Sequence, residues 1–372
     1  MVYLDNAATT FPKPKCVIDE VKKCISEYCG NPGRSGHRLS LEASERIYEA
    51  REAIACHLGF PKPERIVFTH NATYALNFAI WAKIPRNSHI LCSDIEHNAV
   101  IRPLNLLKSY GFADYSQFST DGDIEENIKA ALTPKTKAII STLCSNVTGK
   151  KIQLSTLSTV AKRHNLILII DGSQSAGHEK INLNKTPCDC FCAPGHKGLF
   201  GIQGSGFIIF GSQEQPKPII TGGSGSNSKS PFMPNALPES HEAGTLSTPA
   251  IASLLRGVEF IDKIGVDEIS AKEKLLCDKI KSGLSVIKGI KLYETDGNIV
   301  LFNAENIAEY TFTAKLDEAG ICVRGGFHCA PSAHIKLGTE KNGAVRVSVS
   351  YLNTLTDVEY FLKTVCKTAA EI

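Results

Sequence analysis

The sequence has little that would indicate binding to nucleic acid or insertion into a membrane. Its formal net charge is only +3 over 372 residues, so the charge gives no reason to expect nucleic acid or an anionic membrane as a partner. The longest purely apolar runs, such as "LILII" at 166–170, are far too short to span a bilayer. The opening "MVYLDNAATTFPKPK" lacks the charged segment and apolar run of a signal peptide.

Cysteine, by contrast, is abundant, with 13 residues. The count is odd, and several of these residues, among them Cys92, Cys144 and Cys322, lie inside apolar segments. This pattern predicts reduced thiols in a cytoplasmic protein rather than a framework of disulfide bonds. A buried free cysteine behaves by default as a small apolar side chain, so we expect most of them to have no chemical role.

Short apolar segments rich in β-branched residues alternate with helical patterns in the N-terminal half of the chain. These segments are apolar on both faces, as parallel strands covered by helices are. A helix is expected at 40–58, where apolar residues recur on one face. The alternation predicts an α/β fold with a mostly parallel sheet. The expected strands are 65–69, 89–94, 137–144, 166–171 and 206–210, and the apolar helix positions are Ala43, Ile47, Ala50, Ile54 and Leu58.

The segment 221–249 is rich in Gly, Ser and Pro and predicts a long loop, which in compact domains is usually functional or disordered. Whether 221–240 is ordered stays open. A helix follows in "AIASLLRGVEFIDKIG", and from about 258 the pattern changes to α+β, with strands near "IVLFNA" and "AVRVSVS". We therefore predict a large domain over 16–257 and a small C-terminal domain formed by 1–15 and 258–372.

Polar residues follow the ends of several expected strands, where open parallel sheets bind ligands. Asn71, Ala72 and Thr73 would open a helix whose free N–H groups, with the Thr73 hydroxyl, suit a phosphate. A plain N-cap is the simpler explanation of these three residues taken alone. His97 and Asn146 follow the next two expected strands, and each could be purely structural.

An acid and a lysine complete this set. Asp171 closes a very apolar strand, where an unpaired carboxylate is costly, so it needs a helix N-cap or a cationic ligand nitrogen as partner. Lys197 lies among Gly and Pro in "CAPGHKGLFG". The chain thus offers, in this order, a cradle for a phosphate, an aromatic ring that could stack, an acid and a lysine. This set matches what pyridoxal 5'-phosphate requires, because the cofactor forms a Schiff base with a lysine and needs a carboxylate at its pyridine nitrogen. We expect Gly195 and Gly198 to let the backbone approach this cofactor.

The whole chain resembles the class V aminotransferase family of fold-type I pyridoxal-phosphate enzymes, and within it the group II cysteine desulfurases. The motifs "YLDNAATT", "EHNAV", "SNVTG", "DGSQ", "GHKG", "EAGT" and "VRGGFHCA" follow in the order of that family. The resemblance implies a large domain with a mostly parallel sheet of the seven-stranded type, a small α+β domain, and a homodimer with shared active sites.

The resemblance also implies roles for single residues. Lys197 would bind the cofactor covalently, Asp171 would pair with its pyridine nitrogen, and Gln174 with its ring hydroxyl. His97 would stack on the ring and perform acid–base steps. The phosphate would be held by Ala72, Thr73 and His196 and, from the other subunit, by Thr245.

Asn146 and Arg346 would bind the substrate carboxylate according to the same resemblance. The residues alone agree for Arg346, since an arginine in an apolar strand is well suited to bidentate carboxylate binding. A buried ion pair within the protein is the alternative for this arginine.

Cys329, in "RGGFHCAPSAH", matches the persulfide-forming cysteine of the family. Nearby Arg324, His328 and His334 could favour its reactive thiolate form. The resemblance implies that sulfur passes from L-cysteine to Cys329 and then to an acceptor protein or thiol, as in iron–sulfur cluster assembly, with release of L-alanine. The alternatives are an L-selenocysteine lyase, another class V aminotransferase or lyase that does not use Cys329, and a non-catalytic scaffold of the same fold.

No metal site is expected. Cys188, Cys190 and Cys192 alternate and would share one face of a strand. At about 3.3 Å per residue, however, three successive residues on one face spread too far to close easily on one ion, and the turn-based spacing of zinc ligands is missing. Whether this row of cysteines has any role stays open.

Overall fold

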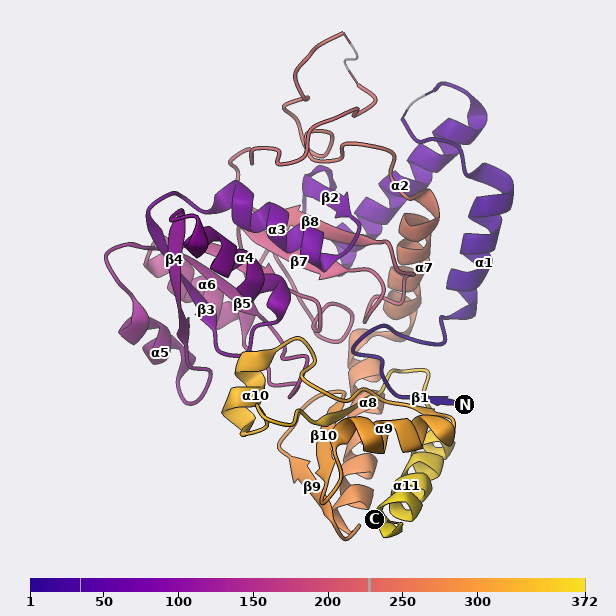
Figure 1. Ribbon diagram of the computed structural model, residues 1–372. Helices are drawn as coiled ribbons and strands as arrows, with labels where there is room; N and C mark the ends of the chain where they lie inside the picture. The colour runs from indigo at the N-terminus through magenta and orange to yellow at the C-terminus, as the bar shows by residue number, and fades with distance from the viewer. Residues whose placement is uncertain (34, 227–228, 372) are drawn as a thin grey trace.

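The computed structural model describes residues 1–33, 35–226 and 229–371 and contains a central seven-stranded sheet (Figure 1). The strand order is β2-β8-β7-β6-β5-β3-β4, and all strands are parallel except β8, which is antiparallel to both of its neighbours. This confirms the predicted α/β class. The strands are β2 (Ile66–Thr69), β3 (Ser88–Ser93), β4 (Ala113–Phe118), β5 (Thr136–Thr142), β6 (Ile167–Asp171), β7 (Cys190–Pro194) and β8 (Gly206–Phe210).

The five expected strands are confirmed as β2, β3, β5, β6 and β8, with small shifts at their ends. The pattern does not predict β4, an edge strand in which Ala113 and Phe118 are buried but Asp114 is exposed. An edge strand is covered less completely than a central one, so it lacks the continuous apolar run that marks the others. Strand β7 coincides with part of the cysteine row.

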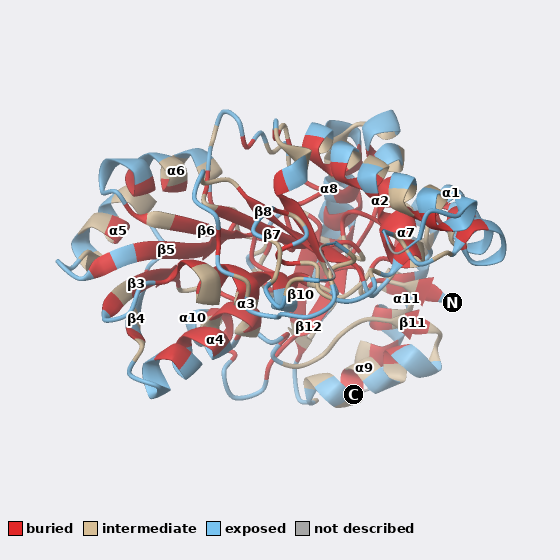
Figure 2. Cartoon of the chain, turned by 90° about the horizontal axis from the view of Figure 1, so that it is seen from above, coloured by how far each residue is buried: buried red, intermediate tan, exposed pale blue. Residues whose placement is uncertain are grey.

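Helices cover both faces of this sheet. The apolar core on one face includes residues of α2 and α7, and the core on the other face includes residues of α3 and α4. Figure 2 shows the buried strands lying between helices whose outer sides are exposed. The helix expected at 40–58 is α2, and its five predicted core residues are all buried. The bounds are α2 (Arg38–His57), α3 (Ala72–Lys83), α4 (Asn98–Ser109), α5 (Ile124–Ala131), α6 (Leu154–Arg163) and α7 (Thr248–Ile264).

The C-terminal part forms a second, smaller core around an antiparallel sheet of order β12-β10-β9. The N-terminal strand β1 (Val2–Tyr3) joins this part by pairing in parallel with β11 (Ile321–Cys322), and both termini lie at this end in Figure 1. The other elements here are α8 (Val266–Ser285), β9 (Ile290–Tyr293), β10 (Ile299–Ala304), α9 (Glu309–Glu318), α10 (Pro331–Leu337), β12 (Val345–Ser348) and α11 (Leu355–Ala370). Helix α1 (Lys15–Lys23) and the short turns Cys24–Tyr28 and Pro63–Arg65 complete the set.

The predicted domain boundary after residue 257 falls inside helix α7. Apolar residues of α7 as far as Ile261 belong to the core of the seven-stranded sheet. The exact position of the boundary between the two domains stays a prediction. The expected long loop is found, because the described residues between β8 and α7 form no helix or strand, with 227–228 outside the described residues. In the part of the chain that the structure covers, no helix has the length and apolar character needed to cross a bilayer.

Candidate active site

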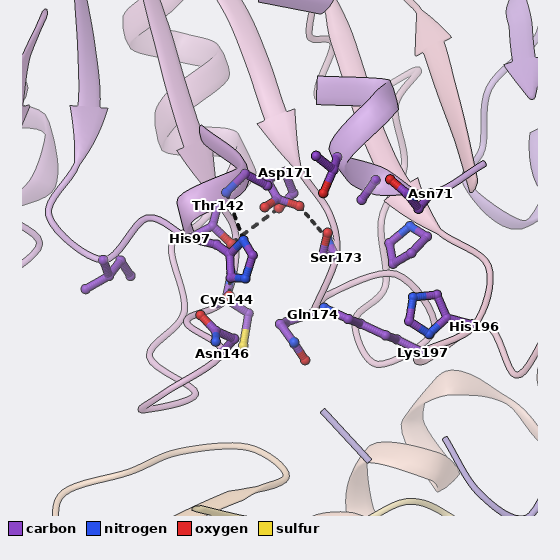
Figure 3. A pocket seen from close by; sticks show the side chains of 15 residues that line it. Asn71, His97, Thr142, Cys144, Asn146, Asp171, Ser173, Gln174, His196 and Lys197 are labelled. Atoms are coloured by element: carbon purple, nitrogen blue, oxygen red, sulfur yellow. Dashed lines mark hydrogen bonds between the residues drawn. The ribbon is translucent and has the colours of Figure 1, made fainter. Parts of the chain in front are cut away.

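The residues that follow five strands meet at one edge of the central sheet and form a pocket (Figure 3). Strands β2, β3, β5, β6 and β7 run in the same direction, so the segments after them reach the same edge. Predicted site residues from all five segments line this pocket: Ala72, Thr73, His97, Asn146, Asp171, Gln174, His196 and Lys197. The other predicted residues, Cys329, Arg346 and Thr245, lie outside it.

Lys197 extends into this pocket from the loop after β7, toward Gln174 in Figure 3. Burial lowers the pKa of Lys197 to about 8, although the nearby Asp171 carboxylate opposes this effect. Among the described residues none accepts a hydrogen bond from its Nζ atom. A minor fraction of the amine, about a tenth at pH 7, is therefore neutral. The neutral amine is the form that acts as a nucleophile or a base.

The N-terminal segment holds the backbone at Lys197. The carbonyl of His196 accepts hydrogen bonds from the Thr10 N–H at 3.1 Å and from Lys13 Nζ at 2.9 Å. The Thr9 hydroxyl donates to the same carbonyl at 3.1 Å, and the Thr10 hydroxyl donates to the Lys197 carbonyl at 3.1 Å. The motif "YLDNAATT" does not by itself indicate this contact with the Lys197 loop.

Asp171 lies at the end of β6 and is only 2% exposed. One of its carboxylate oxygens accepts a hydrogen bond from the Ser173 N–H at 2.9 Å. A buried carboxylate with one neutral donor is well placed to pair with a cationic group in the pocket. The neighbouring Gln174 donates from Nε2 to the carbonyl of Ala7 at 2.9 Å.

The start of helix α3 and His196 form a cradle for an anion. Asn71 caps the helix by accepting from the Tyr74 N–H at 3.1 Å, and the N–H groups of Ala72 and Thr73 have no partner within the helix. Within the described residues, His196 Nδ1 is buried and has no hydrogen-bond partner. A phosphate bound here would satisfy these donors, so the observed cradle fits the phosphate of pyridoxal phosphate.

Close packing within the protein gives Gly195 and Gly198 a role that the sequence does not indicate. A Cβ atom at Gly195 would lie 2.2 Å from the Ser205 hydroxyl, and one at Gly198 would lie 2.3 Å from the Ala176 carbonyl. Neither glycine lines the pocket. They are needed because neighbouring protein segments pack closely against this loop, and the expected approach of the cofactor to the backbone here stays a prediction.

His97 caps helix α4, because its Nδ1 accepts from the Ala99 N–H at 2.9 Å. Burial, followed by the positive charge of Lys197, lowers the pKa of His97 to about 4. The ring is therefore neutral at physiological pH, with its hydrogen on Nε2. His97 thus has a structural role as a helix cap, and its predicted stacking and acid–base roles stay predictions.

Arg346 is buried and forms the ion pair considered for it. Its Nη2 lies 2.7 Å from a carboxylate oxygen of Asp5, and its Nη1 donates to the Asn146 carbonyl at 2.8 Å. Its Nε is buried without a partner among the described residues, and its predicted contact with the substrate carboxylate stays a prediction. The Asn146 side chain donates to the His328 carbonyl at 2.7 Å. Sequence analysis did not predict the contribution of Asp5.

Cys329 is exposed and lies at a second cavity next to the pocket. Thr73, His97 and Ala99 line both cavities, so the thiol stands at the entrance to the site. Arg324 Nη2 lies 3.7 Å from the Cys329 sulfur and supplies positive charge beside it.

The expectation that His328 and His334 also supply positive charge beside Cys329 is wrong. Burial, followed by the charge of Arg346, lowers the pKa of His328 to about 2 and of His334 to about 4. Both rings are therefore neutral near pH 7 and cannot stabilise a thiolate as cations.

The row Cys188, Cys190 and Cys192 is buried, and burial raises the pKa of all three thiols. The described residues contain no group of His, Cys, Asp and Glu side chains that could hold a metal ion. All 13 cysteines are free. These three thiols are part of the apolar core on the two faces of the sheet.

Thr245 is exposed and lines a separate cavity together with Tyr74 and His241. The structure does not bring it to the phosphate cradle of its own chain. Its predicted contact with the cofactor of another subunit therefore stays a prediction.

The family model Aminotransferase class-V matches residues 2–361. The chain belongs to this family. It is similar to a probable cysteine desulfurase of Methanothermobacter thermautotrophicus, with 30% identity over 96% of this chain and 92% of the relative. A probable cysteine desulfurase of Halalkalibacterium halodurans is 30% identical over 99% of this chain and 93% of the relative.

Among solved structures, the chain resembles the apo form of a cysteine desulfurase from Thermococcus onnurineus. The TM-score is 0.90 at 28% identity, covering 100% of this chain and 95% of that one. The class V assignment and the resemblance to cysteine desulfurases inferred from the motifs are thus confirmed, together with the fold.

Acidification should destabilise this class V protein below about pH 6.5. Five buried or half-buried histidines have pKa values of about 4 or lower in the folded protein and stay neutral there, whereas in the unfolded chain they bind protons near their ordinary pKa of 6.5. Between these pKa values, each histidine should lower the free energy of unfolding by about 1.4 kcal/mol for each unit by which the pH falls. Three buried groups act in the opposite direction but are fewer than the histidines. Burial raises the pKa of Glu96 to about 8 and also raises the pKa of Glu242, and Glu273 raises the pKa of His178 against the effect of burial. The histidines are His97, His196, His241, His328 and His334.

Urea unfolding followed by circular dichroism at pH 8.0, 6.5 and 5.0 measures this effect. Stability should be fully present above pH 6.5 and fall as the pH decreases. The variant His334→Gln, which lacks one of these groups, should show a shallower loss. Equal slopes for the variant and the native protein would contradict the assignment of a depressed pKa to His334.

Proposed function

We propose that this protein is a pyridoxal-phosphate-dependent cysteine desulfurase that converts L-cysteine to L-alanine and takes up the sulfur as a persulfide on Cys329. The observation that carries the proposal is the exposed thiol beside Arg324 at the entrance of a pocket that contains Lys197. The names of its relatives in the class V family support it. An aminotransferase that does not use a thiol would have no need of a cysteine at this position.

The residues of the pocket fit the cofactor. Lys197 would hold it covalently, and the cradle of Ala72, Thr73 and His196 would hold its phosphate. Asp171 would pair with its pyridine nitrogen, and His97 would lie against its ring. Once bound there, pyridoxal phosphate supplies an electron sink for the α-carbon of an amino acid.

The groups of the chain then perform the proton and sulfur steps. Lys197 Nζ, partly neutral near pH 7, accepts the α-proton of the substrate. The Cys329 thiolate attacks the substrate sulfur, so that an S–S bond forms while the bond between that sulfur and the substrate Cβ breaks. The electron pair left on carbon takes up a proton, and L-alanine results. The sulfur is oxidised as the carbon is reduced, so no further oxidant or reductant is required.

An acceptor thiol would then remove the sulfur from Cys329, which is accessible because it is exposed. We extend the proposal to a homodimer in which Thr245 contacts the cofactor of the partner subunit, and to a cytoplasmic protein that supplies sulfur for iron–sulfur cluster assembly. The free state of all 13 cysteines supports a reducing compartment.

Purified protein incubated with L-cysteine and a thiol reductant should release sulfide and alanine in equal amounts. The same assay with L-selenocysteine and with a panel of other amino acids tests the specificity. Turnover of other amino acids with a keto acid, and no sulfide from L-cysteine, would instead indicate an aminotransferase.

Replacing Arg346 by lysine should raise KM for L-cysteine about tenfold to a hundredfold, with a smaller change in kcat. Lysine cannot offer two parallel donors to the substrate carboxylate, and a charge-assisted hydrogen bond contributes about 1.5–3 kcal/mol. Steady-state kinetics measure the effect, and Arg163→Lys, at an exposed surface ion pair, is the matched control. An unchanged KM together with a lower melting temperature would show that Arg346 serves only its ion pair with Asp5.

A further inference from the structure

The segment that carries Cys329 has an unfavourable backbone conformation. The φ angles of His328 and Cys329 are +49° and +57°, in the left-handed region that residues other than glycine usually avoid because Cβ comes too close to the backbone. Such conformations persist only where the surrounding contacts hold them. The contacts of this segment therefore show how the thiol is positioned.

A row of hydrogen bonds connects helix α10 and the turn after it to this segment. Thr339 Oγ1 lies 2.8 Å from His334 Nδ1, and His334 Nε2 lies 3.1 Å from His328 Nδ1. His328 Nε2 lies 3.1 Å from the Arg324 carbonyl oxygen. The planes of the two rings differ by only 18°. The row thus joins Thr339 to the residue whose guanidinium contacts the Cys329 sulfur.

The partners determine the direction of every hydrogen bond in this row. A carbonyl only accepts, so His328 Nε2 carries a hydrogen, and the neutral His328 ring then accepts at Nδ1. His334 must therefore donate from Nε2 and accept at Nδ1, which leaves the Thr339 hydroxyl as the donor to His334. Both rings are buried, at 2% and 0% exposure, so water does not replace a lost partner.

Two further contacts attach this segment to the pocket. The Asn146 side chain donates to the His328 carbonyl at 2.7 Å, and the Asn98 N–H donates to the Cys329 carbonyl at 2.7 Å. Asn98 is the first residue of helix α4, so the Cys329 carbonyl satisfies an N–H that has no partner within the helix. The two carbonyls are thus held by Asn146 and Asn98, and the His328 ring is held by His334 of α10.

We propose that Thr339, His334 and His328 form a latch that holds residues 328 and 329 in the left-handed conformation and keeps the Cys329 thiol beside Arg324 at the pocket entrance. His334 and Thr339 are positioning residues, because they act on Cys329 through His328. The consequence for sulfur transfer rests on the proposed function. The positioning of the thiol does not, and it can be measured on its own.

The test is the alkylation rate of Cys329 by iodoacetamide at pH 7 in the full-length protein, measured by mass spectrometry of peptides. His334→Leu removes both ring nitrogens, and Thr339→Val removes only the hydroxyl. His334→Gln keeps a donor in place of Nε2 and is the rescue variant. The exposed thiols of Cys56 and Cys366 serve as references in the same samples.

We expect the Cys329 rate to fall about fivefold or more in His334→Leu and less in Thr339→Val, with His334→Gln closer to the native rate and the reference thiols unchanged. In the sulfide assay, kcat should fall while KM for L-cysteine stays constant. The kcat is calculated per folded protein, with the folded fraction taken from circular dichroism, because a loss of folded protein would also lower the apparent kcat. An unchanged or faster rate at Cys329 in a folded His334→Leu variant overturns the latch. If that variant does not fold, Thr339→Val decides by the same criterion.

The alkylation test of the latch and the sulfide test of the proposed function can fail independently of each other. If Cys329→Ala kept full sulfide release, Cys329 would not be the sulfur acceptor. The alkylation rates of the latch variants would still show whether the row positions the thiol.

Discussion

Replacing Cys329 by alanine should stop the proposed release of sulfide from L-cysteine, while the protein should keep the proposed cofactor. The thiol is the only group proposed to attack the substrate sulfur, and alanine offers no nucleophile. Cys329 lies outside the pocket that contains Lys197 and Asp171, so the cofactor should bind as before. The expected decrease in sulfide release is at least about 10³-fold, as for other groups that react directly. Sulfide is measured colorimetrically, and the cofactor by its absorption spectrum.

Cys366→Ala is the matched control, because Cys366 is an exposed thiol on α11, outside both cavities. It should leave both readings unchanged. Full sulfide release by Cys329→Ala would refute the desulfurase assignment and leave the cofactor assignment intact. A loss of colour in Cys329→Ala would instead show that the cysteine loop contributes to cofactor binding.

Replacing Lys197 by alanine should abolish turnover of every amino acid and remove the covalent attachment of the cofactor. The side chain supplies both the bond to the cofactor and the base for the α-proton, and each contribution alone is large. We expect kcat to fall by at least about 10³-fold. Borohydride reduction followed by digestion should place a pyridoxyl mass on the peptide that contains Lys197 in the native protein and on no peptide of the variant.

The variant Lys197→Arg tests whether the positive charge of Lys197 is sufficient for activity or whether its reactive amine is required. Arginine keeps a positive charge near Asp171 but stays protonated, so it can neither form the covalent bond nor accept a proton. It should therefore be as inactive as the alanine variant. Activity retained by Lys197→Arg, or a reduced adduct on a different lysine, would show that Lys197 is not the attachment site.

Much of the fold was predictable because its signals are local. A buried parallel strand such as β6 reads as a continuous apolar run, and helix α2 shows its core face by periodicity. The pocket was predictable for the same reason, since parallel strands bring the residues that follow them to one edge. The edge strand β4 was not, because its exposure breaks the apolar run.

The contacts between distant segments could not be predicted. Two such contacts depend on how the N-terminal segment packs. One is the ion pair of Arg346 with Asp5, which are separated by 341 residues, and the other is the hydrogen bond from the Thr10 hydroxyl to the Lys197 carbonyl. The close packing against Gly195 and Gly198 could not be predicted either, because the sequence does not identify the neighbouring segments.

By itself, the sequence determined the fold class, the order of the reactive groups and the family, because residue type and periodicity are properties of the chain alone. Only the tertiary structure decided which side chains of the site are charged near neutral pH. It showed that Lys197 is partly neutral, that His328 and His334 are neutral, and that Arg324 is the cation beside Cys329. Protonation depends on burial and on nearby charges, and both are set by packing between segments that lie far apart in the sequence.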